Sequence, residues 1–163
     1  MRREKSVTIV DDQVPSNPDQ DGVSEDRLAI LVEAFYAKVR KDSVLGPVFN
    51  AAIGDWPEHL EKLNAFWSSV MLTSGRYKGN PMAAHLKHRQ SIDPRMFSRW
   101  LALWRETARE TLNDKGAAGV IAKAERIAQS LELGMFLRLD GAGRNLSRQS
   151  GEVEGNAEPL PPA

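Results

Sequence analysis

The sequence of 163 residues contains no cysteine. Without thiol groups the chain cannot form disulfides, cysteine-ligated zinc sites, iron–sulfur clusters or a thiolate-ligated haem. A chain that uses no disulfide is also typical of reducing compartments, so we expect a cytoplasmic protein.

The sequence also lacks an excess of charge of either sign and any long apolar run. It carries 22 basic and 22 acidic residues, for a formal net charge of zero, which differs from the basic surface of a nucleic-acid-binding protein. No segment approaches the roughly 18 apolar residues of a membrane span, and the polar N-terminus has no apolar stretch typical of a secretory signal. We therefore expect neither nucleic acid nor membrane as a partner.

The two ends differ in composition from the middle of the chain. Residues 1–23 are polar and contain Pro15, Pro18 and Gly22, so we predict a flexible N-terminal arm. Residues 140–163 are rich in glycine and proline and contain no aromatic residue, so we predict a disordered tail. Residues 24–139 show helical periodicity and no clear strand, which predicts one all-α domain.

Capping residues divide this domain into helices. Ser24, Asp55, Asn80 and Asp93 each precede a segment that can form a helix. Glu58 follows Asp55 as in a capping box, and the last two caps are followed directly by proline, which suits a first helical turn. The predicted helices run from Ser24 to about Lys41, from Asp55 to about Val70, over about two turns from Asn80, from Asp93 past Ala108, and from about Ala117 to Leu139. We expect Gly46 and Pro47 to break regular structure between the first two.

The three histidines are candidates for a metal or haem site. His59 shares a helical face with Trp56 and Leu63, which directs its ring at or beside the core. His85 lies on the short helix that begins after Asn80, and His88 follows near the end of that helix. The residues alone also allow purely structural roles for two of these histidines. His59 could be a hydrogen-bonded core histidine, and His88 could be an exposed histidine that interacts favourably with the helix dipole.

Three segments, taken in order, resemble the truncated globins of the third group. They are FYAKVRKDSVLGPVFN, DWPEHLEKLNAFWSSVMLTSGRYKGNPMAAH and MFSRWLALWRET, and the resemblance extends over about residues 25–138. It implies a two-over-two helical sandwich around haem b. Composition and periodicity alone do not indicate haem.

The resemblance also assigns roles to individual residues. The histidine that closes the GNPMAAH segment, His85, matches the iron ligand of the family, whereas His88 does not match the motif. The polar residues that face a bound ligand are expected to be Tyr36, His59 and Trp100, although Tyr36 by itself could equally be a boundary residue. The residues expected to contact haem are Phe49, Leu63, Phe66, Arg76, Tyr77 and Phe97, with the loop of Arg76, Tyr77 and Lys78 either pairing with the haem propionates or solvated.

The implied activity concerns small diatomic ligands: oxygen, nitric oxide or carbon monoxide. A hydrogen bond to a charged acceptor contributes roughly 1.5–3 kcal/mol, so two such donors would slow oxygen release by a factor on the order of a hundred. This favours oxygen, nitric oxide or peroxide chemistry, such as nitric oxide dioxygenase or peroxidase-like activity, over oxygen transport. We expect a monomer served by an unidentified reductase. The alternatives are a gas sensor without turnover and, less in keeping with the histidines, a haem-free helical interaction module.

Overall fold

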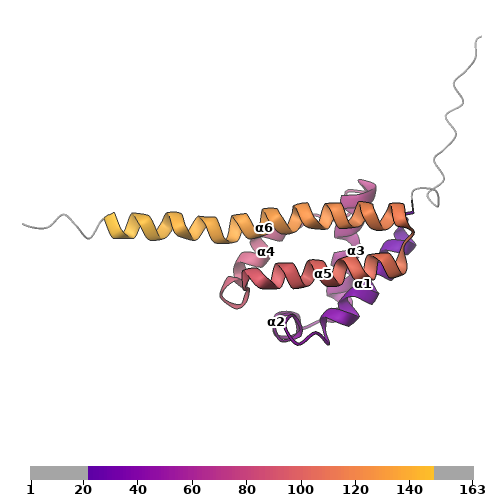
Figure 1. The fold of residues 1–163 in the computed structure, drawn as a ribbon, viewed down its shortest axis with the longest axis horizontal. Coiled ribbons are helices and arrows are strands. Elements are labelled where there is room, and N and C mark those ends of the chain that lie inside the picture. The colour runs from indigo at the N-terminus through magenta and orange to yellow at the C-terminus, as the bar shows by residue number, and fades with distance from the viewer. Residues whose placement is uncertain (1–21, 149–163) are drawn as a thin grey trace, which may run out of the picture.

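The computed structural model describes residues 22–148, with side-chain environments through Leu137. Within that range every regular element is helical (Figure 1). None of these helices combines the length and the apolar character that crossing a bilayer requires. The elements are α1 (Glu25–Val39), α2 (Gly46–Ala52), α3 (Trp56–Leu72), α4 (Pro81–Lys87), a short 3-10 turn (Arg89–Ser91), α5 (Pro94–Thr111) and α6 (Asp114–Arg148).

Four helix starts follow from capping side chains, as the sequence predicts. In each, a side-chain oxygen of the cap accepts a hydrogen bond from a backbone N–H of the first turn, which satisfies one of the donors that a helix leaves unpaired. The capping pairs are Ser24 with Arg27 at 3.3 Å, Asp55 with Glu58 at 3.0 Å, Asn80 with Ala83 at 3.1 Å, and Asp93 with Arg95 at 2.7 Å.

The expected break at Gly46 and Pro47 is wrong, because α2 begins there. Proline needs no N–H partner in a first turn and its fixed φ suits a helix, so the same dipeptide starts a helix as readily as it ends one. A glycine is needed at position 46 because the backbone there passes close to that of Arg40: a Cβ on Gly46 would lie 2.9 Å from the Arg40 carbonyl oxygen. The Asp42 carboxylate accepts from the backbone N–H of Leu45 at 3.0 Å and so holds the turn that leads into α2.

The predicted limits of the last helix are also wrong. Helix α6 starts at Asp114, where the Asn113 side chain accepts from the Gly116 N–H at 2.8 Å, and it continues to Arg148 rather than ending near Leu139. Residues 140–148 are therefore helical. Val23, which we assigned to the arm, is buried in the core. Residues 1–21 and 149–163 lie outside the described residues, so the arm and the tail stay predictions.

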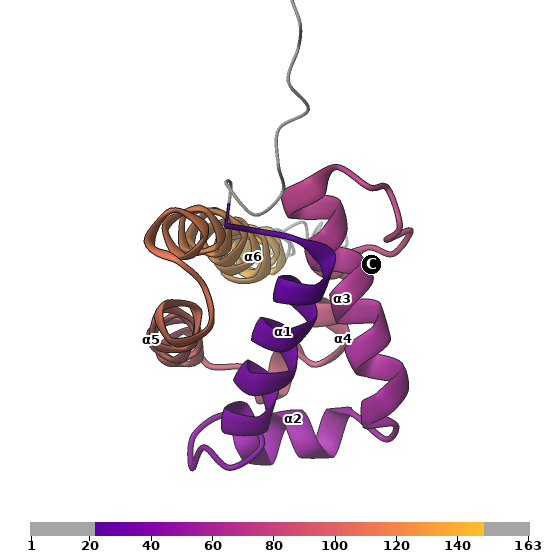
Figure 2. The same ribbon diagram turned by 90° about the vertical axis from the view of Figure 1, so that its right-hand side faces the viewer.

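The helices form two antiparallel pairs that cross each other. Helices α5 and α6 run side by side in opposite directions in Figure 1, and Figure 2 shows α1 and α3 as the second pair. Helix α3 is antiparallel to α1, because Ser68 near its end bonds to Glu25 at the start of α1, whereas His59 near its start faces Tyr36. The core lies where α1, α3, α5 and α6 meet.

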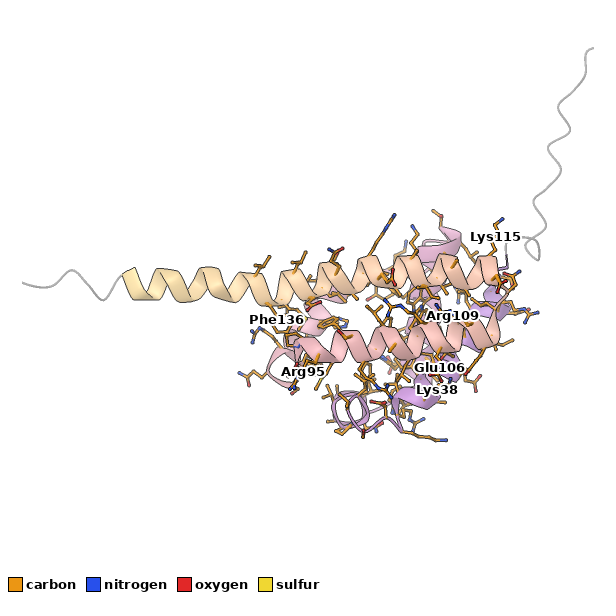
Figure 3. The ribbon with its side chains drawn as sticks, in the orientation of Figure 1. Lys38, Arg95, Glu106, Arg109, Lys115 and Phe136 are labelled. Carbon is orange, nitrogen blue, oxygen red and sulfur yellow. The ribbon has the colours of Figure 1, made fainter. Side chains whose placement is uncertain are left out.

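Ion pairs on the surface connect α1 to α5. Lys38 reaches Glu106 at 2.8 Å and Glu110 at 2.7 Å, and Figure 3 shows Lys38 and Glu106 facing each other. Exposed pairs of this kind contribute little to stability, typically about 0–1 kcal/mol. The apolar core therefore dominates the association of the two layers.

Candidate functional site

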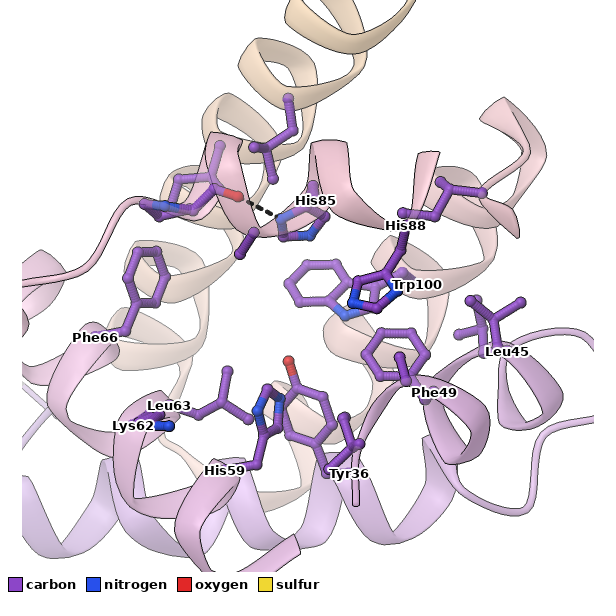
Figure 4. Close-up of a pocket in the computed structure, with 18 of the residues that line it drawn as sticks. Tyr36, Leu45, Phe49, His59, Lys62, Leu63, Phe66, His85, His88 and Trp100 are labelled. Atoms are coloured by element: carbon purple, nitrogen blue, oxygen red, sulfur yellow. Dashed lines mark hydrogen bonds between the residues drawn. The ribbon is translucent and has the colours of Figure 1, made fainter. Parts of the chain in front are cut away.

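A cavity of about 510 Å³ opens between the two helix pairs, within the ~300–1,000 Å³ range of ligand pockets. All the predicted site residues line it except Arg76. Those that line it are Tyr36, Phe49, His59, Leu63, Phe66, Tyr77, His85, Phe97 and Trp100. Figure 4 shows His85 on one side of this space and Tyr36 and His59 on the opposite side.

The ring of His85 is oriented by its own helix. Asn80 caps α4 and Pro81 occupies its first turn, which places His85 one turn further on, with its Nδ1 2.7 Å from the Pro81 carbonyl oxygen. Because a carbonyl can only accept, Nδ1 carries the proton and donates. This fixes the neutral tautomer and leaves the lone pair of Nε2 available, the arrangement that histidine ligands of metals use.

His88 occupies a different position, although it also lines the cavity. It is exposed and ends α4, where its backbone N–H donates to the His85 carbonyl oxygen at 3.0 Å. An exposed position at a helix C-terminus agrees with the interpretation that its ring interacts with the helix dipole. The carbonyl-oriented imidazole of His85 is therefore the better candidate ligand.

The hydroxyl of Tyr36 is a fixed hydrogen-bond donor in the cavity. The residue is only 4% exposed, and Figure 4 shows its hydroxyl directed into the cavity toward the side occupied by His85. Burial raises the pKa of Tyr36 well above its usual range, while the side chain of Trp100 acts in the opposite direction. The phenol thus stays protonated throughout the physiological range.

His59 lies beside Tyr36 on α3 and is half-buried. Its ring stands edge-on to Tyr36 at 6.2 Å between centroids and to Trp56 at 5.9 Å. Burial lowers the pKa of His59, and the positive charge of Lys62 lowers it further. A neutral imidazole at pH 7 can donate from one ring nitrogen and accept at the other.

Trp100 completes the polar side of the cavity. Its indole plane stacks on that of Trp104, with centroids 5.3 Å apart and planes at 7°. Phe35 packs edge-on against Trp100 from α1, with centroids 5.1 Å apart. Because the indole can only donate, the hydrogen bond between the Trp100 and Tyr36 side chains runs from the indole N–H to the Tyr36 hydroxyl oxygen.

Arg76 does not line the cavity in this structure. Its guanidinium pairs with Glu25 at the start of α1, at 2.7 Å. The next residue behaves as predicted: Tyr77 lines the cavity, and its backbone N–H donates to the Ser69 hydroxyl at 2.8 Å. The two consecutive side chains of this loop therefore point in different directions: Arg76 toward Glu25 and Tyr77 toward the cavity.

Several lining residues were missed by sequence reasoning. Three lie on one apolar face of α6, and helical periodicity cannot distinguish a core face from a cavity wall. Lys62 has no apolar signal at all. The missed residues include Lys62, Leu45, Val48, Ile53, Ile92, Met96, Ile127, Ala128 and Leu131.

Comparison with known proteins gives an independent assignment. No family model matches the chain. The group 3 truncated hemoglobin ctb of Campylobacter jejuni is 35% identical over 114 residues, which is 68% of this chain and 89% of that protein. The crystal structure of a group III truncated hemoglobin from Campylobacter jejuni superimposes with a TM-score of 0.67 at 34% identity and covers 70% of this chain and 92% of that one. The chain therefore belongs to the group III truncated haemoglobins, and its all-α fold is that of a truncated globin.

Proposed function

We propose that the cavity binds haem b with His85 as the protein ligand of the iron. The observation that carries this proposal is the hydrogen bond from His85 Nδ1 to the Pro81 carbonyl oxygen, which leaves Nε2 free on the cavity side. A ring nitrogen held in that way is suited to a metal and has little other use in an apolar cavity.

The remaining lining fits a porphyrin. Phe49, Leu63, Phe66 and Phe97 supply apolar surface for a flat aromatic group. Lys62 also lines the cavity and carries a positive charge that could neutralise a carboxylate of the bound group. Apolar walls with a cationic residue among them match the two parts of haem, an apolar ring and charged propionates.

When bound, the haem iron would supply an open coordination position for a diatomic ligand. Around that position the chain holds two donors, the Tyr36 hydroxyl and the Trp100 indole N–H, with the neutral His59 beside them. Each donor stabilises negative charge on a ligand by roughly 1.5–3 kcal/mol. The Tyr36 hydroxyl is positioned before the ligand arrives, whereas the Trp100 N–H would exchange its hydrogen bond to Tyr36 for one to the ligand.

Strong retention of oxygen favours reaction over transport. We propose chemistry on oxygen, nitric oxide or peroxide, of the nitric oxide dioxygenase or peroxidase type, in a cytoplasmic monomer. The Tyr36 hydroxyl can hold a proton at the bound ligand and His59 can hold or move one there, which assists cleavage of an O–O bond. Electrons must come from outside the chain, so a separate reductase completes the reaction.

Two measurements on the purified full chain test this proposal. Titration with haem should give a sharp Soret band at one haem per chain, and its absence would exclude the haem-protein assignment. The oxygenated protein mixed with nitric oxide should yield one nitrate per nitric oxide. Ligand binding without nitrate or peroxide turnover would support the alternative of a gas sensor.

A further inference from the structure

Three of the four tryptophans form a continuous ring stack along the wall of the cavity. Trp104 lies in the middle, with Trp100 on one side at 5.3 Å and 7° between planes, and Trp67 on the other at 4.3 Å and 20°. Trp100 and Trp67 both line the cavity, whereas Trp104 is fully buried. Parallel stacking of this kind gives more overlap between π systems than the edge-on packing common among core aromatics.

We propose that this stack carries single electrons toward the ligand position and so moves oxidising equivalents to Tyr77, which lines the loop side of the same cavity. Beyond Trp67 the aromatic contact continues through Phe66, which lies 5.5 Å from Trp67 and 5.2 Å from Tyr77 between centroids. The proposal rests on the haem-binding function above and adds an oxidation site apart from the ligand position. Reducing substrates too large to enter the cavity would be oxidised there.

The electrons and protons balance with hydrogen peroxide as the oxidant. Each peroxide takes two electrons and two protons in the cavity and leaves as two waters. An electron taken from the Trp100 indole is replaced from Trp104, then from Trp67, and then from Tyr77, whose phenolic proton goes to solvent. The tyrosyl radical is reduced in turn by a phenolic reductant from solution, and the sequence runs twice per peroxide.

The surroundings of each ring favour this direction. The Trp104 Nε1–H donates to the Val120 carbonyl oxygen at 3.2 Å, and a neutral amide oxygen is too weak a base to keep that proton. Oxidised Trp104 would therefore remain a radical cation and would regain its missing electron from Trp67. Tyr36 is buried, with its pKa raised by that burial, so its proton has no ready exit. Tyr77 is half-buried on a loop, where its hydroxyl proton can reach water.

The test locates the oxidised residue in the haem-loaded full chain. The ferric protein is mixed with stoichiometric hydrogen peroxide and a nitroso spin trap, and adducts are mapped by peptide mass spectrometry. Wild type should carry the adduct on Tyr77. Trp104→Phe keeps an aromatic ring but removes the middle indole, so the Tyr77 adduct should be lost and oxidation should remain on Trp100.

Trp56→Phe is the matched control, since Trp56 lies outside the stack and packs under Arg40. It should retain the Tyr77 adduct. A far-ultraviolet circular dichroism couplet from the stacked indoles gives a readout that needs no haem. It should be present in wild type and Trp56→Phe and absent in Trp104→Phe. If Trp104→Phe does not fold, Trp67→Phe serves instead: the Tyr77 adduct should again be lost, and the couplet should weaken to that of the remaining Trp100–Trp104 pair.

The outcomes distinguish failure of the electron relay from failure of the proposed haem-binding function. An undiminished Tyr77 adduct in Trp104→Phe, or adducts confined to Trp100 in wild type, would overturn the electron relay. If the wild-type chain bound no haem, the proposed function would fall and the relay with it. If haem bound and its Soret band responded to peroxide without any adduct on Tyr77, only the relay would fall.

Discussion

The two walls of the cavity are built differently. Helix α1, which carries Tyr36, buries a full apolar face, whereas α4, which carries His85, has no buried residue. On the α1 side the groups that would face a ligand are also core residues. On the α4 side the key ring is positioned by a local hydrogen bond to Pro81 within its own helix.

Because of this difference, substitutions in the two walls should have different effects on folding stability and on cofactor binding. Substitutions on the α1 wall should change folding stability and ligand chemistry together, because the same packing supports both. Substitutions on α4 should change cofactor binding with little effect on the stability of the haem-free chain. The reason is that α4 has no buried residue, so it contributes little to the stability of the fold until a ligand fills the cavity.

The largest effect is expected for His85→Ala, which should abolish stable haem retention. Its matched control, His88→Ala, should leave the Soret band nearly intact, because His88 ends the helix and is exposed. Both variants should unfold like wild type in the haem-free state. Haem loss in His88→Ala with retention in His85→Ala would transfer the ligand role to His88.

Phe35→Ala should show the next largest effect, on stability. Phe35 is fully buried and contacts Tyr36, Trp100 and Trp104 edge-on. Truncating a buried phenylalanine costs about 3–5 kcal/mol. Met82→Ala on α4 is the comparison and should cost clearly less, because Met82 is only half-buried. Urea denaturation of the haem-free proteins measures both, and equal losses would contradict the difference between the walls.

Tyr36→Phe should affect ligand chemistry while keeping the packing. It removes only the hydroxyl that points into the cavity. Since a lost hydrogen bond to a charged acceptor costs roughly 1.5 kcal/mol or more, the oxygen dissociation rate should change by at least about tenfold. Release should be faster if the hydroxyl donates to the ligand, and slower if its loss frees the Trp100 indole N–H for the ligand. Trp100→Phe is a second, less conservative probe, since it also removes volume. Stopped-flow oxygen release measures both, and unchanged rates in the two variants would mean that neither residue faces the ligand.

Local signals in the sequence were sufficient for the parts of this fold that local chemistry controls. The caps at Ser24, Asp55, Asn80 and Asp93 are chosen by residue type, so those helix starts could be predicted. The start of α2 could not, because Gly46 and Pro47 suit a helix start as well as a break. The end of α6 was also missed, since its glycines lower helix propensity without preventing a helix.

For the site, sequence similarity located residues better than geometry could have done. His59 and Tyr36 fall on apolar faces that predict burial, but nothing local tells which buried face meets a cavity. The apolar α6 residues Ile127 and Leu131 could therefore not be identified as cavity-lining from periodicity. The ion pair of Arg76 with Glu25 could not be predicted either, because no local pattern reveals so distant a partner.

Asp42→Asn should weaken the connection between α1, α2 and α5 by a smaller amount, about 1–2 kcal/mol. The Asp42 carboxylate is 5% exposed, accepts from the Leu45 N–H, and pairs with Arg99 at 2.6 Å. The hydrogen bond from Arg99 holds the pKa of this carboxyl below its usual range, so its contribution is complete above the ordinary value of about 3.9 and is lost as the pH falls. Denaturation curves of wild type and variant should therefore differ at pH 7 and converge below about pH 4; a constant difference would exclude the ionic contribution.

The smallest effect is expected for Arg76→Gln, which tests the corrected assignment of the loop. Arg76 is half exposed and pairs with the equally exposed Glu25, so its loss should cost at most about 1 kcal/mol of stability. Because Arg76 does not line the cavity, haem dissociation measured by transfer to an acceptor protein should be unchanged. Lys62→Gln removes a charge of the same sign from a residue that does line the cavity, and it should release haem faster if a cation there pairs with a propionate. Faster release in Arg76→Gln with no change in Lys62→Gln would restore the role first assigned to Arg76, and would show that its bond to Glu25 gives way when haem is bound.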